Sequence, residues 1–295
     1  MANFFIKIFV TIIAGIYSIF GVTVGSVDTN DVDALADGAD IRVVSYNVKS
    51  LKWTNMSGDE NFYTTSVRLA AELLELDADS IGLQEVTYDR LVLFDKYLDG
   101  YSYVGESRGS DEPEYNLIYY KTDKYNVLDY GTFWLSDTPN TESAFENSRC
   151  YRICTWVLLE NKETGECYVH ANTHLDHSTI AAVRVNQFTV LIEQLEELGL
   201  LDYPLVLTGD FNMGNTDTIS DLMTSAGLTN SRLTATVTDS STTWNDWGTY
   251  TDVNIIDYAL VNSGFTPVVY KVVSSYIDGK WASDHNAIYV DLSFS

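Results

Sequence analysis

Short polar motifs stand in or directly beside most of the runs in this chain that are typical of buried β-strands. Asn47 lies in the strand-like segment IRVVSYNV (41–48), and Glu85 lies near the end of SIGLQEV (80–86). A sheet holds the side chains at its strand ends at fixed positions, so residues far apart in sequence can be brought together there. The pattern predicts a fold built on sheets, with polar residues gathered at strand ends.

Five further motifs of this kind follow along the chain. They are EPEYNLIYY with Glu114, NTHLDH with His174 and Asp176, TGDFN with Asp210 and Asn212, IIDY with Asp257, and SDHN with Asp284 and His285. An ordinary turn or capping hydrogen bond explains each motif alone. Such explanations do not predict polar groups in or beside six separate strands, so the combination indicates one active site.

The hydrophobic periodicity of the chain predicts helices mixed with strands. Helices are predicted at 66–79, 88–98, 178–199 and 218–226, and strands at 41–48, 80–86, 116–122, 125–135, 153–161, 167–175, 204–211, 254–262, 268–276 and 286–294. The helix at 178–199 is expected to begin with a Ser or Thr cap and to end at Gly199. No linker is evident, so we expect one α/β domain over residues 41–295, with sheets packed between helices.

The N-terminus differs in kind from the rest of the chain. Residues 4–25 are almost entirely apolar, with Lys7 as the only charge. This composition is typical of a secretory signal peptide, and the run is long enough to anchor the chain in a membrane if it is not cleaved. We therefore expect a secreted or membrane-anchored protein, with an acidic spacer at 26–40 before the folded domain.

Charge and cysteine content exclude several classes of protein. With 17 basic and 42 acidic residues, the chain has a net charge of −25 and lacks the basic surface that tight binding along a nucleic-acid backbone requires. The acidity is equally explained as a means of keeping an exported protein soluble. Three cysteines are too few for a disulfide scaffold, and their spacing does not match a zinc site. Short nucleic acids and small phosphoesters remain open as ligands.

The residue types in the motifs suit metal-assisted phosphoester cleavage, which needs a cation, a group that positions water, and donors for the developing charge. Glu85 is a natural ligand for Mg²⁺, and Asn47 could orient it or contribute its amide oxygen. Asp210 and Asn212 tend to project to the same side, as an acceptor for water and an amide for phosphate.

Two imidazoles complete this chemistry. An aspartate such as Asp284 or Asp257 could fix one imidazole nitrogen, such as one of His285, and leave the other free to face the phosphate. His174 supplies the second imidazole, and Glu114 could pair with it. A zinc hydrolase is a competing hypothesis because HLDH resembles half of a metal site, but a chain with four His and many Asn, Asp and Glu in the motifs argues against it.

In their order along the chain, SYNVK, LQEV, NTHLDH, TGDFN, IDYALV and SDHNAIYV resemble the motifs of the endonuclease/exonuclease/phosphatase superfamily, the DNase I-like fold. The resemblance covers residues 41–295. It implies a four-layer α/β sandwich with two central mixed β-sheets. It also implies a Mg²⁺- or Mn²⁺-dependent hydrolase in which an activated water attacks phosphorus in line.

The resemblance further implies a role for each motif residue. The metal site would contain Asn47 and Glu85, with Asp284 as a metal or histidine neighbour. The catalytic set would be His174 on the phosphate, Asp210 aligning water, Asn212 on the phosphate or transition state, and Asp257 orienting the catalytic His285.

The resemblance also implies supporting roles for other residues. Glu114 matches an acid that secreted DNases place beside their first histidine, whereas Glu112 stands where those enzymes have Tyr, which weakens a reading as a DNase. Asp176 and Arg184 resemble a small bacterial-type branch of unassigned substrate. Arg184 is interpreted either as a phosphate clamp or as part of a solvated helix face.

The expected partner is a phosphoester substrate, either nucleic acid or a small phosphorylated molecule. No obligate protein partner is evident, and we expect a monomer. A sphingomyelinase-type lipid phosphodiesterase is an alternative within this class, and a non-catalytic binding module on the same fold is the alternative outside it. Trp53, Trp244 and Trp247 could stack on a base, sugar or lipid headgroup, although packing within loops explains them as well.

Overall fold

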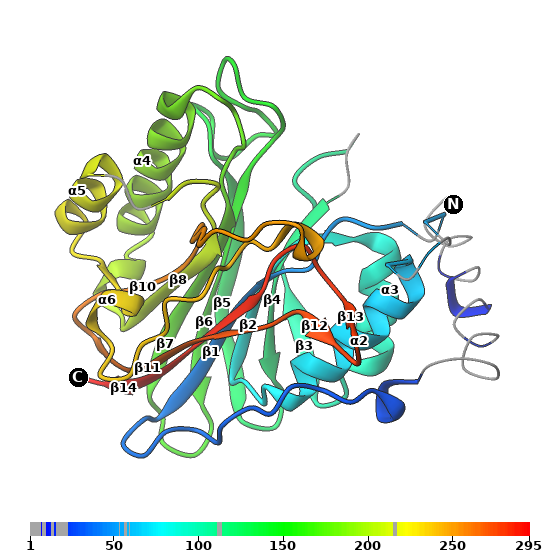
Figure 1. Cartoon of the computed structure of the whole chain (residues 1–295). Helices are drawn as coiled ribbons and strands as arrows, with labels where there is room; N and C mark the ends of the chain where they lie inside the picture. The colour runs from blue at the N-terminus through cyan, green and yellow to red at the C-terminus, as the bar shows by residue number, and fades with distance from the viewer. Residues whose placement is uncertain are drawn as a thin grey trace.

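Two six-stranded β-sheets pack face to face, with helices on their outer faces (Figure 1). The computed structural model describes residues 7, 10–12, 15, 23–52, 54–55, 58, 60–110, 114–214 and 217–295. The first sheet has the order β11 (Phe265–Val273), β14 (Ala287–Phe294), β1 (Ile41–Asn47), β2 (Ser80–Thr87), β4 (Glu114–Lys121) and β3 (Tyr101–Val104). The second has the order β5 (Tyr125–Trp134), β6 (Ile153–Asn161), β7 (Cys167–His174), β8 (Leu205–Asp210), β10 (Asp257–Val261) and β9 (Thr229–Asn230).

Both sheets are mixed. β1 pairs with β2, and β7 with β8, in parallel, whereas neighbours such as β1 and β14 or β6 and β7 are antiparallel. The predicted four-layer α/β sandwich with two central mixed sheets is confirmed.

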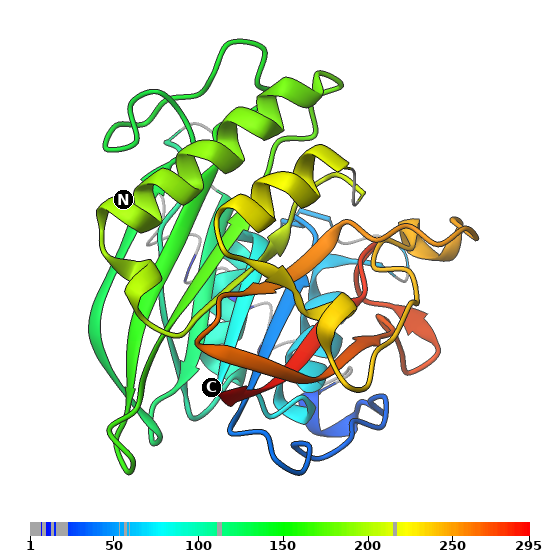
Figure 2. The same cartoon turned by 90° about the vertical axis from the view of Figure 1, so that its left-hand side faces the viewer.

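Helices cover the outer face of each sheet. On the first sheet, α2 (Phe62–Glu75) and α3 (Tyr88–Tyr97) contribute Leu69 and Phe94 to a buried cluster with Val44 and Leu83. On the second sheet, α4 (Ala181–Glu197) and α5 (Asp217–Ser225) lie side by side (Figure 2). The smaller elements are α6 (Ser231–Thr234), three 3₁₀ turns (Val24–Ser26, Leu200–Asp202 and Asp246–Gly248), and the hairpin of β12 (Tyr276–Ile277) and β13 (Lys280–Trp281).

A mainly apolar layer fills the space between the sheets. Successive side chains of a strand point to opposite faces, so Val43 of β1 packs in the cluster that contains Val206 of the other sheet, while Val44 joins the cluster under the helices. Strands covered on both faces read as nearly continuous hydrophobic runs, which is why IRVV and LVL were recognisable as buried strands.

A line of buried polar side chains crosses this layer and joins the two sheets. Gln84 Nε2 of β2 donates to Asn172 Oδ1 of β7 over 2.7 Å. His170 lies 2.8 Å from Ser80 Oγ through Nδ1 and 2.8 Å from Thr208 Oγ1 through Nε2. Because a buried polar group without a partner is costly, this network favours one alignment of the sheets. That alignment brings the ends of β1, β2, β7 and β8 together.

Most of the predicted elements are present, with shifted ends. α2 begins at Phe62 rather than at residue 66, because the Asn61 side chain caps it. α4 ends just before Gly199, which has a left-handed conformation, as predicted. The predicted Ser or Thr cap of α4 is wrong, since Ile180 occupies that position and makes no side-chain cap hydrogen bond. β3, β9, β12, β13 and α6 are too short to show a periodicity.

The predicted signal peptide or anchor at 4–25 lies mostly outside the described residues. Within the part of the chain that the structure describes, no helix is long and apolar enough to cross a membrane. The segment predicted as a spacer, 26–40, contacts the domain. Asn30 Nδ2 donates to Glu72 Oε1 over 3.1 Å, and Arg42 donates to the carbonyl of Asp33 over 2.8 Å. This segment therefore adds contacts to the folded domain.

Asn172→Ala is expected to lower the free energy of unfolding by about 3 kcal/mol, because it leaves Gln84 and the carbonyls of Leu83 and Leu117 without their buried partner. Urea denaturation measures this quantity. Asn126→Ala, at an exposed position of β5, is the control and should change stability by less than about 0.5 kcal/mol. Equal effects of the two substitutions would contradict the role of the polar layer.

Candidate active site

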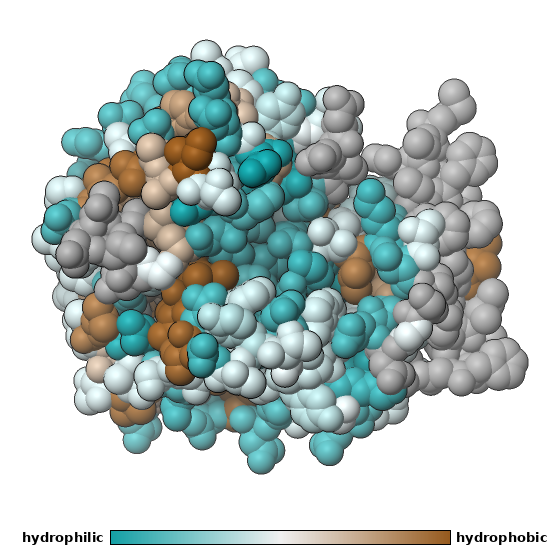
Figure 3. Space-filling model, turned by 45° about the horizontal axis from the view of Figure 1, so that its top comes forward, coloured by the Kyte–Doolittle hydropathy of each residue, from teal (hydrophilic) through white to brown (hydrophobic). Residues whose placement is uncertain are grey.

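The ends of several strands, with the turns beside them, surround one cavity of about 630 Å³. Seen from this end of the molecule, hydrophilic side chains gather in a hollow (Figure 3). The lining includes the predicted Glu85, Glu114, His174, Asp210, Asn212, Asp284 and His285, together with Lys49, Ser50, Arg108, Arg152, His177, Met213, Gly214, Trp244, Asn254 and Ile256. Residues from both sheets and from both ends of the sequence thus meet in one place.

Asn47, at the end of β1, holds two carboxylates together. Its Nδ2 donates to Glu85 Oε1 over 3.1 Å and to Asp210 Oδ2 over 3.0 Å. The backbone N–H of Ser50 donates to the other Glu85 oxygen over 2.9 Å. Burial opposes ionisation of Glu85, but the charge of Lys49 and these hydrogen bonds outweigh it and lower its pKa to about 2. Glu85 is therefore a carboxylate at neutral pH.

Glu85 also has an unusual backbone conformation. Its φ is +59°, and it lies at an irregularity in the pairing of β2 with β4, between Leu83 and Val86. A non-glycine residue at positive φ costs free energy and marks a place where the surroundings dictate the backbone. The irregularity turns the Glu85 side chain toward the cavity instead of continuing the strand alternation.

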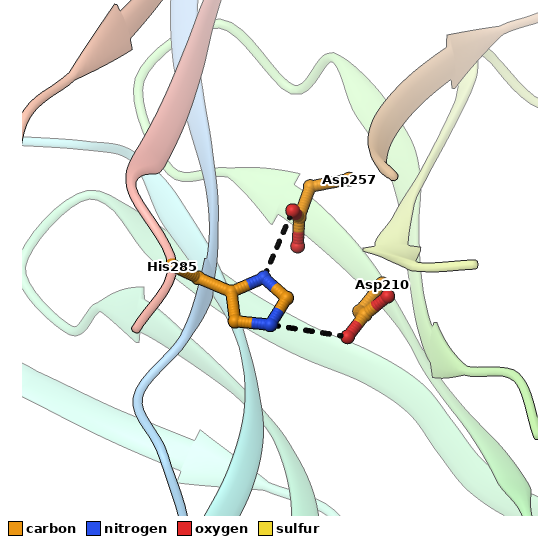
Figure 4. A group of neighbouring side chains, drawn as sticks. All are labelled: Asp210, Asp257 and His285. Carbon is orange, nitrogen blue, oxygen red and sulfur yellow. Dashed lines mark hydrogen bonds and ion pairs between the residues drawn. The ribbon is translucent and has the colours of Figure 1, made fainter. Parts of the chain in front are cut away.

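An Asp–His–Asp group, which shares Asp210 with the contacts of Asn47, forms a second part of the site (Figure 4). The imidazole of His285 lies between two carboxylates, with Nδ1 3.0 Å from Asp257 Oδ2 and Nε2 3.6 Å from Asp210 Oδ2. Burial alone would lower the pKa of His285, but the charges of Asp257 and then Asp210 outweigh burial and raise it. Ligand atoms of these three residues all lie within 4.8 Å of one another, so the group could also bind a cation.

His174 and Asn212 form a neutral edge beside this group. Asn212 Nδ2 lies 2.9 Å from His174 Nε2, and the backbone N–H of Asn212 donates to Asp210 Oδ1 over 2.8 Å. Burial, reinforced by the charges of Arg152 and Arg108, lowers the pKa of His174 well below its usual value. The two imidazoles of the site therefore differ in charge, since His174 is neutral and His285 is biased toward the imidazolium.

Gly209, directly before Asp210, allows the close approach of β7 and β8. A Cβ atom at this position would lie 2.2 Å from the carbonyl oxygen of Thr173, closer than any side chain allows. In the parallel pairing of β7 with β8, His174 lies opposite Asp210. The glycine of the TGDFN motif is therefore required for the contact between these two side chains, and not only for a turn.

Besides His285, the cavity is lined by three residues with cationic side chains, Lys49, Arg108 and Arg152. Lys49 Nζ lies 2.6 Å from Asp284 Oδ2, and Arg108 lies 2.8 Å from Glu114 Oε2. Arg152, directly before β6, has a side-chain nitrogen 3.3 Å from His177 Nδ1. The cavity thus combines carboxylates, neutral donors and guanidinium groups, the combination that a bound phosphate ester needs.

Three supporting residues differ from expectation. Glu114 pairs with Arg108 rather than with His174, whose Nδ1 has no hydrogen-bond partner among the described residues. Asp176 is buried and accepts hydrogen bonds from the backbone of Arg149 and Ser178, so it organises a loop. Arg184 donates to the carbonyls of Asp176 and Ser178 and is not among the residues that line the cavity. The structure thus places the Arg184 side chain against a loop beside the site, and its interpretation as a phosphate clamp stays a prediction.

The family of this chain follows from its match to a family model. Residues 44–285 match the model of the Endonuclease/Exonuclease/phosphatase family. The chain belongs to this family. The resemblance proposed from the six motifs is confirmed, and members of the endonuclease/exonuclease/phosphatase family are phosphoesterases, so the predicted reaction class is confirmed at that level.

Solved structures of two Bacteroides thetaiotaomicron proteins are similar to 86% of this chain. One is a mannosyl-6-phosphatase, 28% identical with a TM-score of 0.79, and all of its chain is covered. The other is an endonuclease/exonuclease/phosphatase family protein, 27% identical with a TM-score of 0.78 and 98% covered. Protein angel of Drosophila melanogaster is 30% identical over 150 residues, 49% of this chain and 42% of that protein. The chain thus spans less than half the length of this curated relative.

Sequence reasoning missed two charged residues of this endonuclease/exonuclease/phosphatase site, Lys49 and Arg152. Lys49 follows the last residue of β1 by two positions, and Arg152 directly precedes β6. Both therefore stand beside a strand end, the feature by which the motif residues were recognised. Glu112, Trp53 and their predicted roles lie outside the described residues.

Proposed function

We propose that this protein is a divalent-metal-dependent phosphoesterase that acts on a small phosphorylated molecule, such as a sugar phosphate. The observation that carries the proposal is the polar cavity of about 630 Å³, a size typical of small-molecule sites. The net charge of −25 opposes binding along a nucleic-acid backbone. The similarity to a mannosyl-6-phosphatase over its whole length supports a phosphorylated sugar among small substrates.

The donor set on one side of the cavity fits Mg²⁺ or Mn²⁺. Glu85 is ionised, and Asp284 Oδ1 is buried with no hydrogen-bond partner among the described residues. Carboxylate oxygens of this kind are the ligands that these hard cations prefer. Asn47 fits the orienting role, because its Nδ2 holds Glu85 and its Oδ1 accepts from the backbone of Lys49. When bound, the ion would supply positive charge to the phosphoryl oxygens.

The Asp257–His285–Asp210 group is better suited to acid–base chemistry than to holding the metal. Both nitrogens of His285 already face carboxylates, so a cation there would have to displace these contacts. We assign to Asp210 the alignment and deprotonation of the attacking water. His285, held by Asp257, and the amide of Asn212 stabilise the charge that develops on the phosphoryl oxygens. His174 positions Asn212 through the 2.9 Å contact between their nitrogens.

We further propose that the protein is exported, on the strength of the apolar segment 4–25. Cell fractionation followed by N-terminal sequencing tests this. Recovery outside the cell with the segment removed, or in the membrane fraction with it retained, would agree with the proposal. An intact soluble chain inside the cell would contradict it.

The purified protein with Mg²⁺ or Mn²⁺ is expected to hydrolyse hexose 6-phosphates with a higher kcat/KM than single-stranded DNA or sphingomyelin, and EDTA should abolish turnover. Glu85→Gln should weaken Mg²⁺ binding in calorimetry by about tenfold or more, because one carboxylate ligand is lost. Glu163→Gln, in an exposed turn, is the control. Turnover that persists in EDTA would contradict metal dependence, and a preference for DNA would contradict the small substrate.

Asp257→Asn is expected to lower kcat by about 100-fold with little change in KM, because His285 loses the carboxylate that orients and charges it. Steady-state kinetics on the best substrate of the panel measures this. Asp129→Asn removes the same charge at an exposed position of β5 and should retain wild-type kcat. A kcat in Asp257→Asn equal to that of this control would remove Asp257 and His285 from the mechanism.

A further inference from the structure

Arg152 is a buried guanidinium that has no acidic partner in the part of the chain that the structure describes. Its side chain lines the cavity, and the residue is 3% exposed. Its Nη2 lies 3.3 Å from His177 Nδ1, and its Nε has no hydrogen-bond partner among the described residues. Within the same described part of the chain, no carboxylate lies within ion-pair distance of it.

An uncompensated charge of this kind is costly. Arginine stays protonated in proteins, so it cannot avoid the cost by losing its proton. Burial of a charge is tolerated when a partner of opposite sign is supplied. The other arginine of the cavity, Arg108, has such a partner in Glu114 at 2.8 Å. For Arg152, the missing partner is expected to come from the substrate.

The surroundings of Arg152 place that partner close to the reaction. Arg152 lines the same cavity as His174, whose Nε2 lies 3.3 Å from Asp210 Oδ2 and 2.9 Å from Asn212 Nδ2. An anion that reaches Arg152 therefore lies near the groups assigned to the phosphoryl oxygens. A guanidinium can hold two oxygens of a phosphate with parallel hydrogen bonds.

We propose that Arg152 is the residue that makes the enzyme prefer phosphomonoesters over phosphodiesters. A monoester near neutral pH carries between one and two negative charges on three terminal oxygens, whereas a diester has one charge on two. A cation held by Glu85 would compensate one of these negative charges, and the guanidinium of Arg152 would compensate the second. A diester would leave the buried guanidinium only partly compensated. This inference rests on the proposed phosphoesterase function and adds the class of ester to it.

The test compares p-nitrophenyl phosphate with bis-p-nitrophenyl phosphate, two esters that share a leaving group. The wild type should prefer the monoester. In Arg152→Met, kcat/KM for the monoester should fall by about 100-fold, in line with loss of a charge-assisted contact, while kcat/KM for the diester should change by less than about threefold. Arg152→Lys should recover part of the preference for the monoester, because lysine restores the positive charge but not the planar guanidinium that can donate two parallel hydrogen bonds.

Arg149→Met is the matched control. It removes the same charge from the same loop, but Arg149 is exposed and is not among the residues that line the cavity. Its ratio of monoester to diester activity should equal that of the wild type. Equal losses on both esters in Arg152→Met, or a wild type that prefers the diester, would overturn the proposal.

Two further measurements separate this role from a structural one. Arg152→Met should have an unchanged or higher midpoint of thermal unfolding, since an unpaired buried charge is removed, whereas a structural arginine would give a lower one. Calorimetry with inorganic phosphate should show weaker binding in Arg152→Met than in Arg149→Met. Equal phosphate affinity would contradict the role of Arg152, whereas absence of any metal-dependent turnover would contradict the proposed function itself.

Discussion

The side-chain amide of Asn47 is the contact on which the rest of the site depends. Asn47 is the last residue of β1 in the first sheet. Its amide donates to Glu85 of that sheet and to Asp210 of the second. Two carboxylates from different sheets are thereby held at one place. This contact exists only if the two sheets are correctly aligned. The buried hydrogen bond from Gln84, the residue before Glu85, to Asn172 of the other sheet helps to set that alignment. A shift in the pairing register of these strands would move the two carboxylates apart and disrupt the site.

Neighbouring charges give the two buried histidines of the site opposite properties. His174 has guanidinium groups nearby, and both desolvation and their charge favour its neutral form. His285 is also buried, but Asp257 and Asp210 reverse the effect of burial and favour the imidazolium. Neighbouring titratable groups whose pKa values are moved apart in this way can take different parts in one reaction. In the proposed mechanism, the neutral imidazole of His174 positions the Asn212 amide, whereas the charged imidazole of His285 faces the phosphoryl oxygens that gain negative charge.

Much of this arrangement could be predicted from the sequence, because it depends on strand ends. The positions of Asn47, Glu85 and Asp210 followed from buried runs that stop at a polar residue, and their order along the chain resembled that of a known family. Partners across the cavity could not be predicted, since they depend on distances between loops. For example, Glu114 pairs with Arg108 and not with His174. The Arg184 side chain donates to a backbone carbonyl of the loop that precedes α4. Lys49 and Arg152 were missed because charged residues next to strands are usually solvent-exposed.

The acidic surface and the cationic side chains inside the cavity act over different distances, and together they support the proposal of a small anionic substrate. At physiological ionic strength, the field of exposed charges is screened within about 8 Å. A nucleic acid extends many times that distance beyond a cavity of this size, so most of its phosphates would meet the acidic surface and be repelled. A single phosphate group that enters the cavity instead meets a lining that includes Lys49, Arg108 and Arg152. The same net charge that disfavours a polyanion therefore costs a small phosphorylated substrate little, provided that its charges are confined to the part inside the cavity.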